Sequence, residues 1–382
     1  MQKRVVIVDV NHLVHMHYHS RVRLSTRVKV DGEYIEKDTT ILNGVLKSLF
    51  RWSKGGSYPL VVCFDRPVPA RKAFFQTYFP DMKIGSGNEY KGNRERMPEA
   101  MWEGISDVES VLRQAGVTCL AQTNYESDDL VYAAVKRAKV LYPDCPIDVI
   151  TNDADLLPLV DDVVSVFIRS KVGTYAVSSN IEKAHYIQVT PDNFQEVVER
   201  LSAYKGYIIP YNSILLHKLL RGDPSDKIHR KDISIQFSPK RWNAMMENMI
   251  ADYVNFEEVF RYGEPQYKIL YKGTNEEFHG TLQDALARPD RDKLYQKICN
   301  TEEIDVILEL LRQYSNLTEE QLDSVEKVYW GMNLNQVYPN ANKQLARKAY
   351  VVGAKGNPDI HQYDEMLYRE SARTFQINLG NY

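Results

Sequence analysis

Three acidic side chains crowd the start of one predicted helix, in the stretch NYESDDLVYAAVKRAKV at residues 124–140. From Leu130 onward apolar residues recur at helical spacing, and Glu126, Asp128 and Asp129 occupy the turn just before them. A helix N-terminus stabilises nearby negative charge by roughly 0.3–1 kcal/mol per group, but three neighbouring carboxylates also repel one another. Divalent cations such as Mg²⁺ prefer carboxylate oxygens and cancel that repulsion. The stretch is therefore either a solvated acidic turn or one wall of a metal site.

Other acidic residues follow apolar runs that read as buried strands. Near-continuous apolar runs are typical of parallel strands covered on both faces, and they occur at residues 4–10, 59–65, 116–122 and 146–153. Asp9 ends the first run, Asp65 the second, and Asp153 with Asp155 the fourth, while the acidic helix follows the third. Ligands of open α/β sheets bind at the carboxyl ends of the strands. Four connections thus bring carboxylates to one sheet edge, which predicts a multi-carboxylate metal site there.

The elements that must position these acids alternate between strand and helix, the pattern of an α/β protein with a mostly parallel central sheet covered by helices. RVKVDGEYIE alternates around Asp31-Gly32 and predicts a hairpin. Amphipathic helices are expected at EIDVILELLRQY and LTEEQLDSVEKVYWGMNL, and a small hairpin plus helix at PQYKILYKGTNEEFHGTLQDALARPD. The remaining expected elements are helices at 39–53, 98–115, 126–142 and 153–160 and strands at 163–168 and 172–177, joined around 171–173.

Composition is that of a soluble globular protein: 382 residues, 43% apolar and 26% charged. No apolar run is long enough for a membrane span, the N-terminus enters a strand directly, and four cysteines lie far apart, so we expect a cytoplasmic protein without a signal peptide. The net charge of −3 argues weakly against a nucleic-acid binder. Basic residues nevertheless cluster between Arg66 and Arg96 and between His217 and Trp242, which favours a local nucleic-acid surface.

Six stretches, in this order, resemble the motifs of the 5′ nuclease superfamily, which comprises flap endonucleases, bacteriophage 5′–3′ exonucleases and the 5′-exonuclease domain of bacterial DNA polymerase I. They are VVIVDVNHLVHMHY, VVCFD, EYKGNRERMPEAM, NYESDDLVYAAVKRA, VITNDADLLPLV and LRGDPSDKI, and they cover roughly residues 3–242. The resemblance implies a PIN-like α/β nuclease core at 1–205 that includes an arch segment at 66–98. A helical DNA-binding region with a diverged helix-hairpin-helix-like element would follow at 206–260, and then a mainly helical C-terminal extension at 261–382.

The activity implied by the resemblance is hydrolysis of DNA phosphodiesters near 5′ ends by two Mg²⁺ ions, for which Mn²⁺ is expected to substitute. Uses in replication, primer removal or recombination would follow, and a stand-alone nuclease of this kind suits a bacteriophage acting in its host's cytoplasm. The first metal site corresponds to Asp9, Asp65, Glu126 and Asp128 with Asp129 close by, and the second to Asp153, Asp155, Asp223 and Asp226. Lys91 and Arg94 match basic residues over the scissile phosphate, and Asp9, Asp65 and Asp153 join them in the catalytic set.

Substrate binding is expected from basic and aromatic residues of the arch and of the segment after the last motif. The implied substrate is DNA with a 5′ end or flap, with RNA paired to DNA as a subsidiary substrate, and replication proteins are candidate partners of the C-terminal region. The segment HRKDISIQFSPKRW lacks the glycines of the family's hairpin, which puts the monovalent-cation site in doubt, and a helix is expected to begin at Ser238-Pro239. The predicted DNA-binding residues are Arg71, Lys72, Lys83, Tyr90, Ser225, Lys227, Arg230, Lys231, Lys240 and Arg241.

Several alternatives stay open at this point. A PIN-type ribonuclease shares the scaffold but has fewer carboxylates, and a DNA-binding protein without activity would lack a reason for the full acidic set. Tyr90 either stacks on a base or packs within the arch. His12, His15 and His19 share one helical face, which indicates either a zinc site or a helix whose histidines lie near the DNA path.

Overall fold

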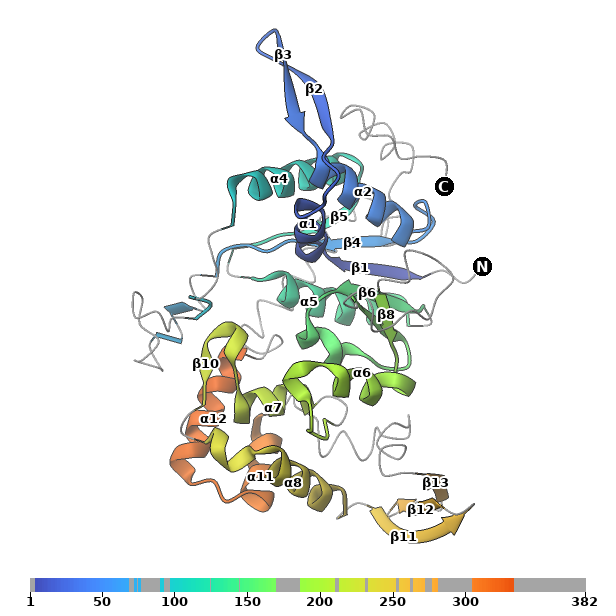
Figure 1. Ribbon diagram of the computed structural model, residues 1–382, viewed down its shortest axis with the longest axis vertical. Helices are drawn as coiled ribbons and strands as arrows, with labels where there is room; N and C mark the ends of the chain where they lie inside the picture. Colours follow the sequence, from blue (N-terminus) through green and yellow to red (C-terminus); the bar gives the residue numbers. More distant parts are fainter. Residues whose placement is uncertain are drawn as a thin grey trace.

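The centre of the molecule is a six-stranded sheet in the order β5-β4-β1-β6-β7-β8 (Figure 1). In this computed structural model the described residues are 4–68, 72–73, 75–76, 90–92, 97–123, 125–143, 145–169, 186–209, 213–230, 233–251, 254–261, 264–271, 277–280 and 304–332. All neighbouring strands pair in parallel except β8, which is antiparallel to β7. The mostly parallel sheet predicted from the sequence is therefore confirmed. Its strands are β1 Val5–Asp9, β4 Leu60–Cys63, β5 Thr118–Leu120, β6 Ile147–Thr151, β7 Val164–Arg169 and β8 Tyr186–Val189.

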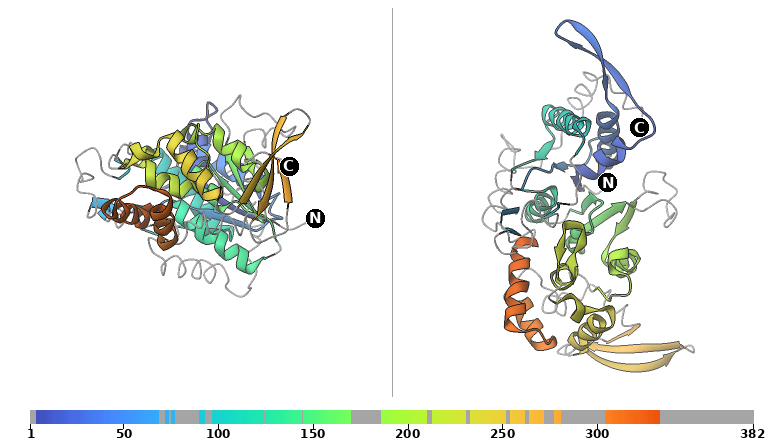
Figure 2. Two further views of the ribbon diagram at one scale, coloured as in Figure 1. Left: turned by 90° about the horizontal axis from the view of Figure 1, so that it is seen from below. Right: turned by 60° about the vertical axis from the view of Figure 1, so that its left-hand side comes forward.

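Two hydrophobic cores, one on each face of the sheet, account for the continuous apolar runs. Side chains alternate along β1, so Val6 and Val8 enter one core and Val5 and Ile7 enter the other. Helices α1 (Val10–Tyr18), α2 (Thr40–Trp52) and α4 (Glu99–Gln114) cover the first face, and α5 (Ser127–Leu141) covers the second (Figure 2). The strand ends that carry the acids are thus held by cores on both sides.

Helices α1 and α2 approach closely at a glycine. The His17 ring of α1 lies over Gly44 of α2, where a Cβ atom would overlap the imidazole. The Nε2 atom of His17 is 3.2 Å from the hydroxyl of Ser48, which also belongs to α2. His17 therefore faces α2 rather than the cleft.

The hairpin expected around Asp31-Gly32 projects from the body of the molecule (Figure 1). It consists of β2 (Ser25–Val30) and β3 (Glu33–Asp38), and both turn residues have positive φ, 50° and 93°. The helix expected at 153–160 is instead a 3₁₀ helix, η2 (Ala154–Leu159), which contains Pro158. Proline lacks an amide hydrogen, so it does not support the ladder of an α-helix.

The second half of the described chain is mainly helical up to residue 251, as expected. The helix predicted to begin at Ser238-Pro239 is confirmed, and the hairpin predicted after residue 264 is formed by β12 and β13. The strand β11, at the end of the region expected to be helical, was not anticipated. The elements of this part of the chain, from residue 191 to residue 280, are η4 Pro191–Asn193, α6 Phe194–Arg200, η5 Ser202–Tyr204, α7 Ser213–Arg221, β9 Gly222–Asp223, η6 Pro224–Asp226, β10 Ile228–His229, η7 Ser234–Phe237, α8 Pro239–Ala251, β11 Val254–Arg261, β12 Glu264–Tyr271 and β13 Glu277–Gly280.

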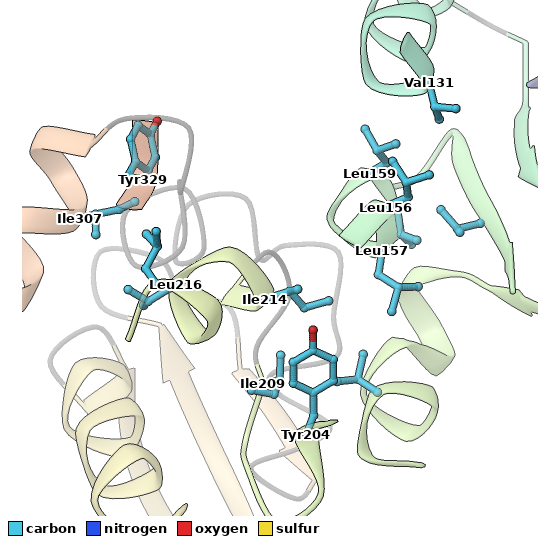
Figure 3. Close-up of a cluster of buried hydrophobic side chains, with 14 of the residues drawn as sticks. Val131, Leu156, Leu157, Leu159, Tyr204, Ile209, Ile214, Leu216, Ile307 and Tyr329 are labelled. Carbon is cyan, nitrogen blue, oxygen red and sulfur yellow. The ribbon is translucent and has the colours of Figure 1, made fainter. Parts of the chain in front are cut away.

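Both amphipathic helices predicted near the C-terminus are present, and they belong to the core. They are α11 (Ile304–Tyr314), which contacts α8, and α12 (Glu319–Met332), which contacts α7. Figure 3 shows Ile307 and Tyr329 from these helices in one buried cluster with Leu216 of α7 and, further along, with Leu157 of η2. The two helices therefore extend the core that begins under the sheet.

Some expectations concern residues outside those described: the strand at 172–177, most of the arch at 66–98, and the C-terminal tail. Within the described part of the chain, every helix is too short or too polar to cross a bilayer.

Candidate active site

Three aspartates lie side by side because the strands that precede them are neighbours in the sheet. Asp9 is the last residue of β1 and caps α1, Asp65 follows β4 by two residues, and Asp153 follows β6 by two residues. Strands β4 and β6 flank β1 in parallel, so all three chains leave the sheet at one edge. All three side chains line a single cleft, as the sequence predicted.

Helix α5 adds two more carboxylates to this cleft and uses a third for its own start. Glu126 is its N-cap and Asp128 lies in its first turn, and both line the cleft. Asp129 does not: it is 2% exposed, and its Oδ2 accepts a hydrogen bond of 2.9 Å from the Glu126 amide. This is a capping box, so the expectation that Asp129 helps to hold a metal is corrected.

The cleft has a volume of about 530 Å³. Five carboxylates face it from the three strand ends and α5, while its other wall is basic and comes from α1 and β7. Among the described residues, no three His, Cys, Asp or Glu side chains are arranged as a metal-ligand shell. The lining residues are Asp9, Asn11, His12, His15, Met16, His19, Asp65, Lys91, Glu126, Ser127, Asp128, Asn152, Asp153 and Arg169.

Hydrogen bonds fix the carboxylates of Asp9 and Asp65. Asp9 accepts from the Thr151 hydroxyl at 3.1 Å and from the Asn11 amide at 3.2 Å. Asp65 accepts from the Ser127 amide at 2.7 Å and from the Asn11 side-chain amide. Asn11 therefore links the ends of β1 and β4, and Ser127 ties the start of α5 to them, so these carboxylates are held in place before any ligand arrives.

Crowding of the carboxylates opposes their ionisation. Burial and the charges of Asp65 and Asp153 raise the pKa of Asp9 to about 7. Burial and the neighbouring carboxylates, Asp153 foremost, raise the pKa of Asp128 well above its ordinary value. Like charges held together at low dielectric favour a proton on one of them. The same excess of negative charge is what a bound dication would neutralise, so the donor set fits hard divalent cations.

Lys91 and Tyr90 bridge this cluster to the loop after α7. Lys91 Nζ lies 2.5 Å from Glu126 Oε1 and 3.7 Å from Asp226 Oδ2, and the Lys91 amide donates to the Asp226 carbonyl at 3.1 Å. The Tyr90 hydroxyl lies 3.2 Å from both carboxylates, and its ring stacks on Phe75 at 4.8 Å. Tyr90 is 4% exposed, so packing in the arch is the correct alternative and base stacking by Tyr90 is excluded in this arrangement.

A second group of acidic side chains surrounds Lys218, a residue that the sequence analysis did not single out. Lys218 Nζ donates to Asp223 Oδ2 at 2.5 Å and to Asp155. Burial and the charge of Asp153 raise the pKa of Asp155 to about 6. Burial opposes the charge of Lys218, but Asp155 and Asp223 raise its pKa above the ordinary value. The four acids assigned to a second metal site are thus divided: Asp153 lines the cleft, Asp155 and Asp223 hold Lys218, and Asp226 faces Lys91.

The predicted DNA-binding residues separate into exposed and buried ones. Lys72, Lys240 and Arg241 are exposed, and Lys227 is half-buried with a positive φ of 63°. Arg230 is 3% exposed and donates to Ser324 of α12, so the expectation that it contacts DNA is corrected. For Ser225 only the backbone is described, as part of η6. The positions that lie outside the described residues are Arg71, Lys83, Arg94 and Lys231.

The histidine face predicted on the first helix is confirmed. His12, His15 and His19 all line the cleft, whereas His17 points to α2. No zinc-type grouping of these side chains is present in the described part of the chain. His12 instead connects Asp9 to Tyr186. Its Nδ1–H donates to the Asp9 carbonyl at 2.5 Å, which leaves Nε2 to accept from the Tyr186 hydroxyl at 2.9 Å.

Comparison with known proteins gives a family match over the nuclease-like core. The model of the family described as 5′-3′ exonuclease, N-terminal resolvase-like domain, matches residues 4–196. A 5′-3′ exonuclease of Aquifex aeolicus is 23% identical over 299 residues, which cover 74% of this chain and 89% of that one. A 5′-3′ exonuclease of Mycoplasma pneumoniae is 28% identical over 156 residues, which cover 40% of this chain and 46% of that one. DNA polymerase I of Lactococcus lactis strain IL1403 is 29% identical over 138 residues, covering 36% of this chain and 14% of the polymerase.

Among solved structures, a bacteriophage T5 flap endonuclease in a pseudo-enzyme–product complex with DNA and metal ions aligns with a TM-score of 0.46 and 16% identity. The alignment covers 92% of this chain and 99% of that one. The T5 5′-exonuclease with bound zinc aligns with a TM-score of 0.44 and 14% identity, and the alignment covers 98% of this chain and 100% of that one.

Proposed function

The chain belongs to the 5′-3′ exonuclease family, and from this we propose that it hydrolyses DNA phosphodiesters near 5′ ends with bound divalent cations. One observation carries the proposal: five carboxylates meet in one cleft from the ends of three neighbouring strands and the start of α5. A binding protein without activity gains nothing from such a cluster, whose crowding raises the pKa of Asp9 to about 7. Removal of 5′ flaps and primers during replication or recombination is the use that we propose for this activity.

We assign cation binding to the cleft carboxylates Asp9, Asp65, Glu126, Asp128 and Asp153, which have the oxygen chemistry that Mg²⁺ and Mn²⁺ require. Bound divalent cations supply an activated water and neutralise charge on the phosphodiester. The protein supplies fixed positions: Asn11 and Ser127 hold Asp65, and Thr151 holds Asp9. Because these carboxylates are already oriented, little reorganisation is needed at the moment of reaction.

Lys91 would provide the cationic contact to the scissile phosphate. Its ammonium lies between Glu126 and Asp226 on the cleft wall, and its side chain is 12% exposed. Its φ of 56° is unusual for a residue with a side chain, and such conformations concentrate at functional sites. Once cations occupy Glu126, the ammonium would lose that partner and turn toward the phosphate, where it offsets negative charge in the transition state. Arg94 is proposed as its companion.

The remaining acids are proposed as a second cation site that forms around Asp153. Asp155 and Asp223 share Lys218, which acts as a built-in cation in their present arrangement. Asp153, Asp155, Asp223 and Asp226 would hold the second dication, whose charge would replace that of the Lys218 ammonium among these acids. We therefore expect weaker cation binding here than at the cleft.

Duplex DNA is proposed to lie over the exposed basic residues of α8, Lys240 and Arg241, with Lys72 on the arch side. Ser225 and Lys227, in the loop that carries the acids, are proposed as neighbouring contacts, together with Arg71, Lys83 and Lys231. RNA paired to DNA remains a proposed subsidiary substrate, and the C-terminal region a proposed docking site for replication proteins.

The test uses 5′-labelled flap DNA, single-stranded DNA and single-stranded RNA, each incubated with Mg²⁺, Mn²⁺ or chelator. We expect cutting of the flap DNA with either metal and none with chelator. Asp128→Asn should abolish it, whereas Asp192→Asn, which changes an exposed aspartate on η4, should cut like the unchanged protein. Cutting of RNA alone would indicate a PIN-type ribonuclease, and binding without cutting would indicate a non-catalytic DNA-binding protein.

A further inference from the structure

The cleft has a second wall that cation binding does not explain. It is formed by His12, His15 and His19 of α1 and by Arg169 at the end of β7. We propose that His15, His19 and Arg169 form a phosphate-binding subsite that holds a phosphate of the cleaved strand beside the one that is hydrolysed. This inference rests on the proposed function, since it concerns the same cleft.

The helix presents its histidines as an ordered surface. His15 and His19 are one helical turn apart, and their rings are stacked at 6.5 Å between centroids with an interplanar angle of 23°. The Tyr18 ring meets the His19 ring edge-on at 5.0 Å. Both histidines are exposed and line the cleft. An imidazole carries an N–H donor in either protonation state, which suits phosphate oxygens.

Arg169 supplies the charge of this wall. It is exposed and lines the same cleft as five carboxylates, yet it makes no ion pair with any residue in the described part of the chain. A guanidinium that serves the fold would normally be paired, as Arg4 is with Asp148 at 2.6 Å at the opposite end of the sheet. Its planar fork of donors matches phosphate oxygens in two-point contacts.

His12 has a different role, because it holds the two walls in register. It accepts the Tyr186 hydroxyl proton and donates to the Asp9 carbonyl, so it joins β8 to the end of β1. Burial, with a contribution from the charge of Arg169, lowers the pKa of His12 to about 4 and keeps it neutral. Tyr186 in turn packs edge-on against Trp52 of α2. The basic wall is therefore a built surface at a defined position relative to Asp9.

The chemistry of the two walls is complementary for a nucleic-acid strand. The carboxylate wall repels phosphate unless cations intervene, whereas the basic wall attracts phosphate directly. A strand crossing the cleft would place its scissile phosphate at the cations and an adjacent phosphate on Arg169 and the histidines. That adjacent group is either a terminal 5′-phosphate, which carries between one and two negative charges at neutral pH, or an internal phosphodiester, which carries one, and both offer anionic oxygens to these donors.

The experiment measures binding in chelator, so it needs no turnover and stands apart from the nuclease test. The probes are fluorescent single-stranded DNA oligonucleotides of one sequence, with a 5′-phosphate or a 5′-hydroxyl, and the readout is anisotropy across a salt series. The variants are Arg169→Gln, the double variant His15→Gln with His19→Gln, and Arg113→Gln as the matched control. Arg113 is exposed on α4 and pairs with Glu109 at 2.7 Å.

We expect Arg169→Gln to weaken binding about tenfold and to reduce the slope of log affinity against log salt by about 0.7, the value for one phosphate contact on a single strand. The double histidine variant should weaken binding in the same direction, and Arg113→Gln should not. Loss confined to the 5′-phosphorylated probe identifies the terminal phosphate, and equal loss on both probes identifies an internal one. Unchanged affinity and salt slope with both probes would overturn the subsite, even if the protein proves to be an active nuclease.

Discussion

Arg230 and Ser324 are 94 residues apart in the chain, yet Arg230 Nη1 donates to the Ser324 hydroxyl at 2.7 Å and to its carbonyl at 3.3 Å. Arg230 follows the short β9–β10 ladder that also carries Asp223, and Gly222 in that ladder has a φ of 83°. A Cβ atom on Gly222 would overlap the Ile228 carbonyl. Helix α12 thus holds, through Arg230, the loop that places Asp223 and Asp226.

The first prediction concerns the stability provided by this contact. Arg230→Gln should lower the free energy of unfolding by about 1–3 kcal/mol, because it removes the buried, charged donor that Arg230 supplies to Ser324. Arg241→Gln, an exposed change on α8, should alter stability by less than about 0.5 kcal/mol. Chemical denaturation measures both. An Arg230→Gln protein of unchanged stability that binds duplex DNA more weakly would show that the residue contacts DNA after all.

Much of the site was predictable because it follows from the pattern of the strands. Apolar runs define β1, β4 and β6, and Asp9, Asp65 and Asp153 come at or just after their ends. Parallel pairing of these strands then brings the acids together without further information. The family match over residues 4–196 agrees with that interpretation of the sequence.

The errors occur where a residue's role depends on a distant partner. Arg230 lies beside other basic residues and was predicted to bind DNA, but it is buried and donates to Ser324 of α12. For Tyr90 the sequence left base stacking and packing within the arch both open, and contacts with Phe75 and two carboxylates decide for packing. Lys218 lies in the last turn of an amphipathic helix, without any local sign that Asp155, 63 residues away, is its partner. Local sequence carries propensity and periodicity, whereas these contacts depend on packing between remote segments.

The helix predicted at 153–160 shows the limit of periodicity for short segments. Its apolar residues Leu156, Leu157 and Leu159 are buried as expected, but Pro158 makes the segment a 3₁₀ helix. Strand β8 was not predicted either, because YIQV is short and only its last residue is buried. Burial was thus easier to predict here than the exact type of element.

The second prediction concerns Asp153. Asp153→Ala should lower turnover at least about 10³-fold, since losing a cation ligand removes several kcal/mol of transition-state stabilisation. DNA affinity in chelator should fall little. Single-turnover kinetics and anisotropy measure the two quantities, and Asp192→Ala is the control. Turnover within tenfold of the unchanged protein would remove Asp153 from the catalytic set.

The third prediction concerns pH and the metal-free protein. The folded pKa of Asp9 is raised to about 7 and that of Asp155 to about 6, both above the ordinary value of 3.8. The folded state therefore binds protons that the unfolded state has lost, and stability falls as pH rises through these values. Between pH 5.5 and 8, loss of the Asp9 proton alone should lower the free energy of unfolding by about 1–2 kcal/mol.

Thermal unfolding in chelator at pH 5.5, 6.5, 7.5 and 8.0 measures this loss. Mg²⁺ should stabilise the protein most at pH 8, because cations compete with protons for the same carboxylates. In chelator, Asp153→Asn should make stability depend less steeply on pH, because the charge of Asp153 contributes to raising the pKa values of both Asp9 and Asp155. A metal-free protein that gains stability from pH 5.5 to 8 would contradict the crowding of these carboxylates.

The last prediction separates the two roles proposed for Lys91. As an ion-pair partner it competes with cations for Glu126, and as a phosphate contact it assists the reaction. Lys91→Met keeps the aliphatic stem and removes the charge. It should lower turnover by about 10²–10³-fold, as the loss of one electrostatic contact to a transition state does, while Mn²⁺ binding measured by calorimetry should be unchanged or tighter. Tyr90→Phe, which removes a hydroxyl bonded to the same two carboxylates, should keep turnover within tenfold. If Lys91→Met instead weakened Mn²⁺ binding and left turnover at saturating metal unchanged, the ammonium would serve only to hold Glu126 and Asp226 in place.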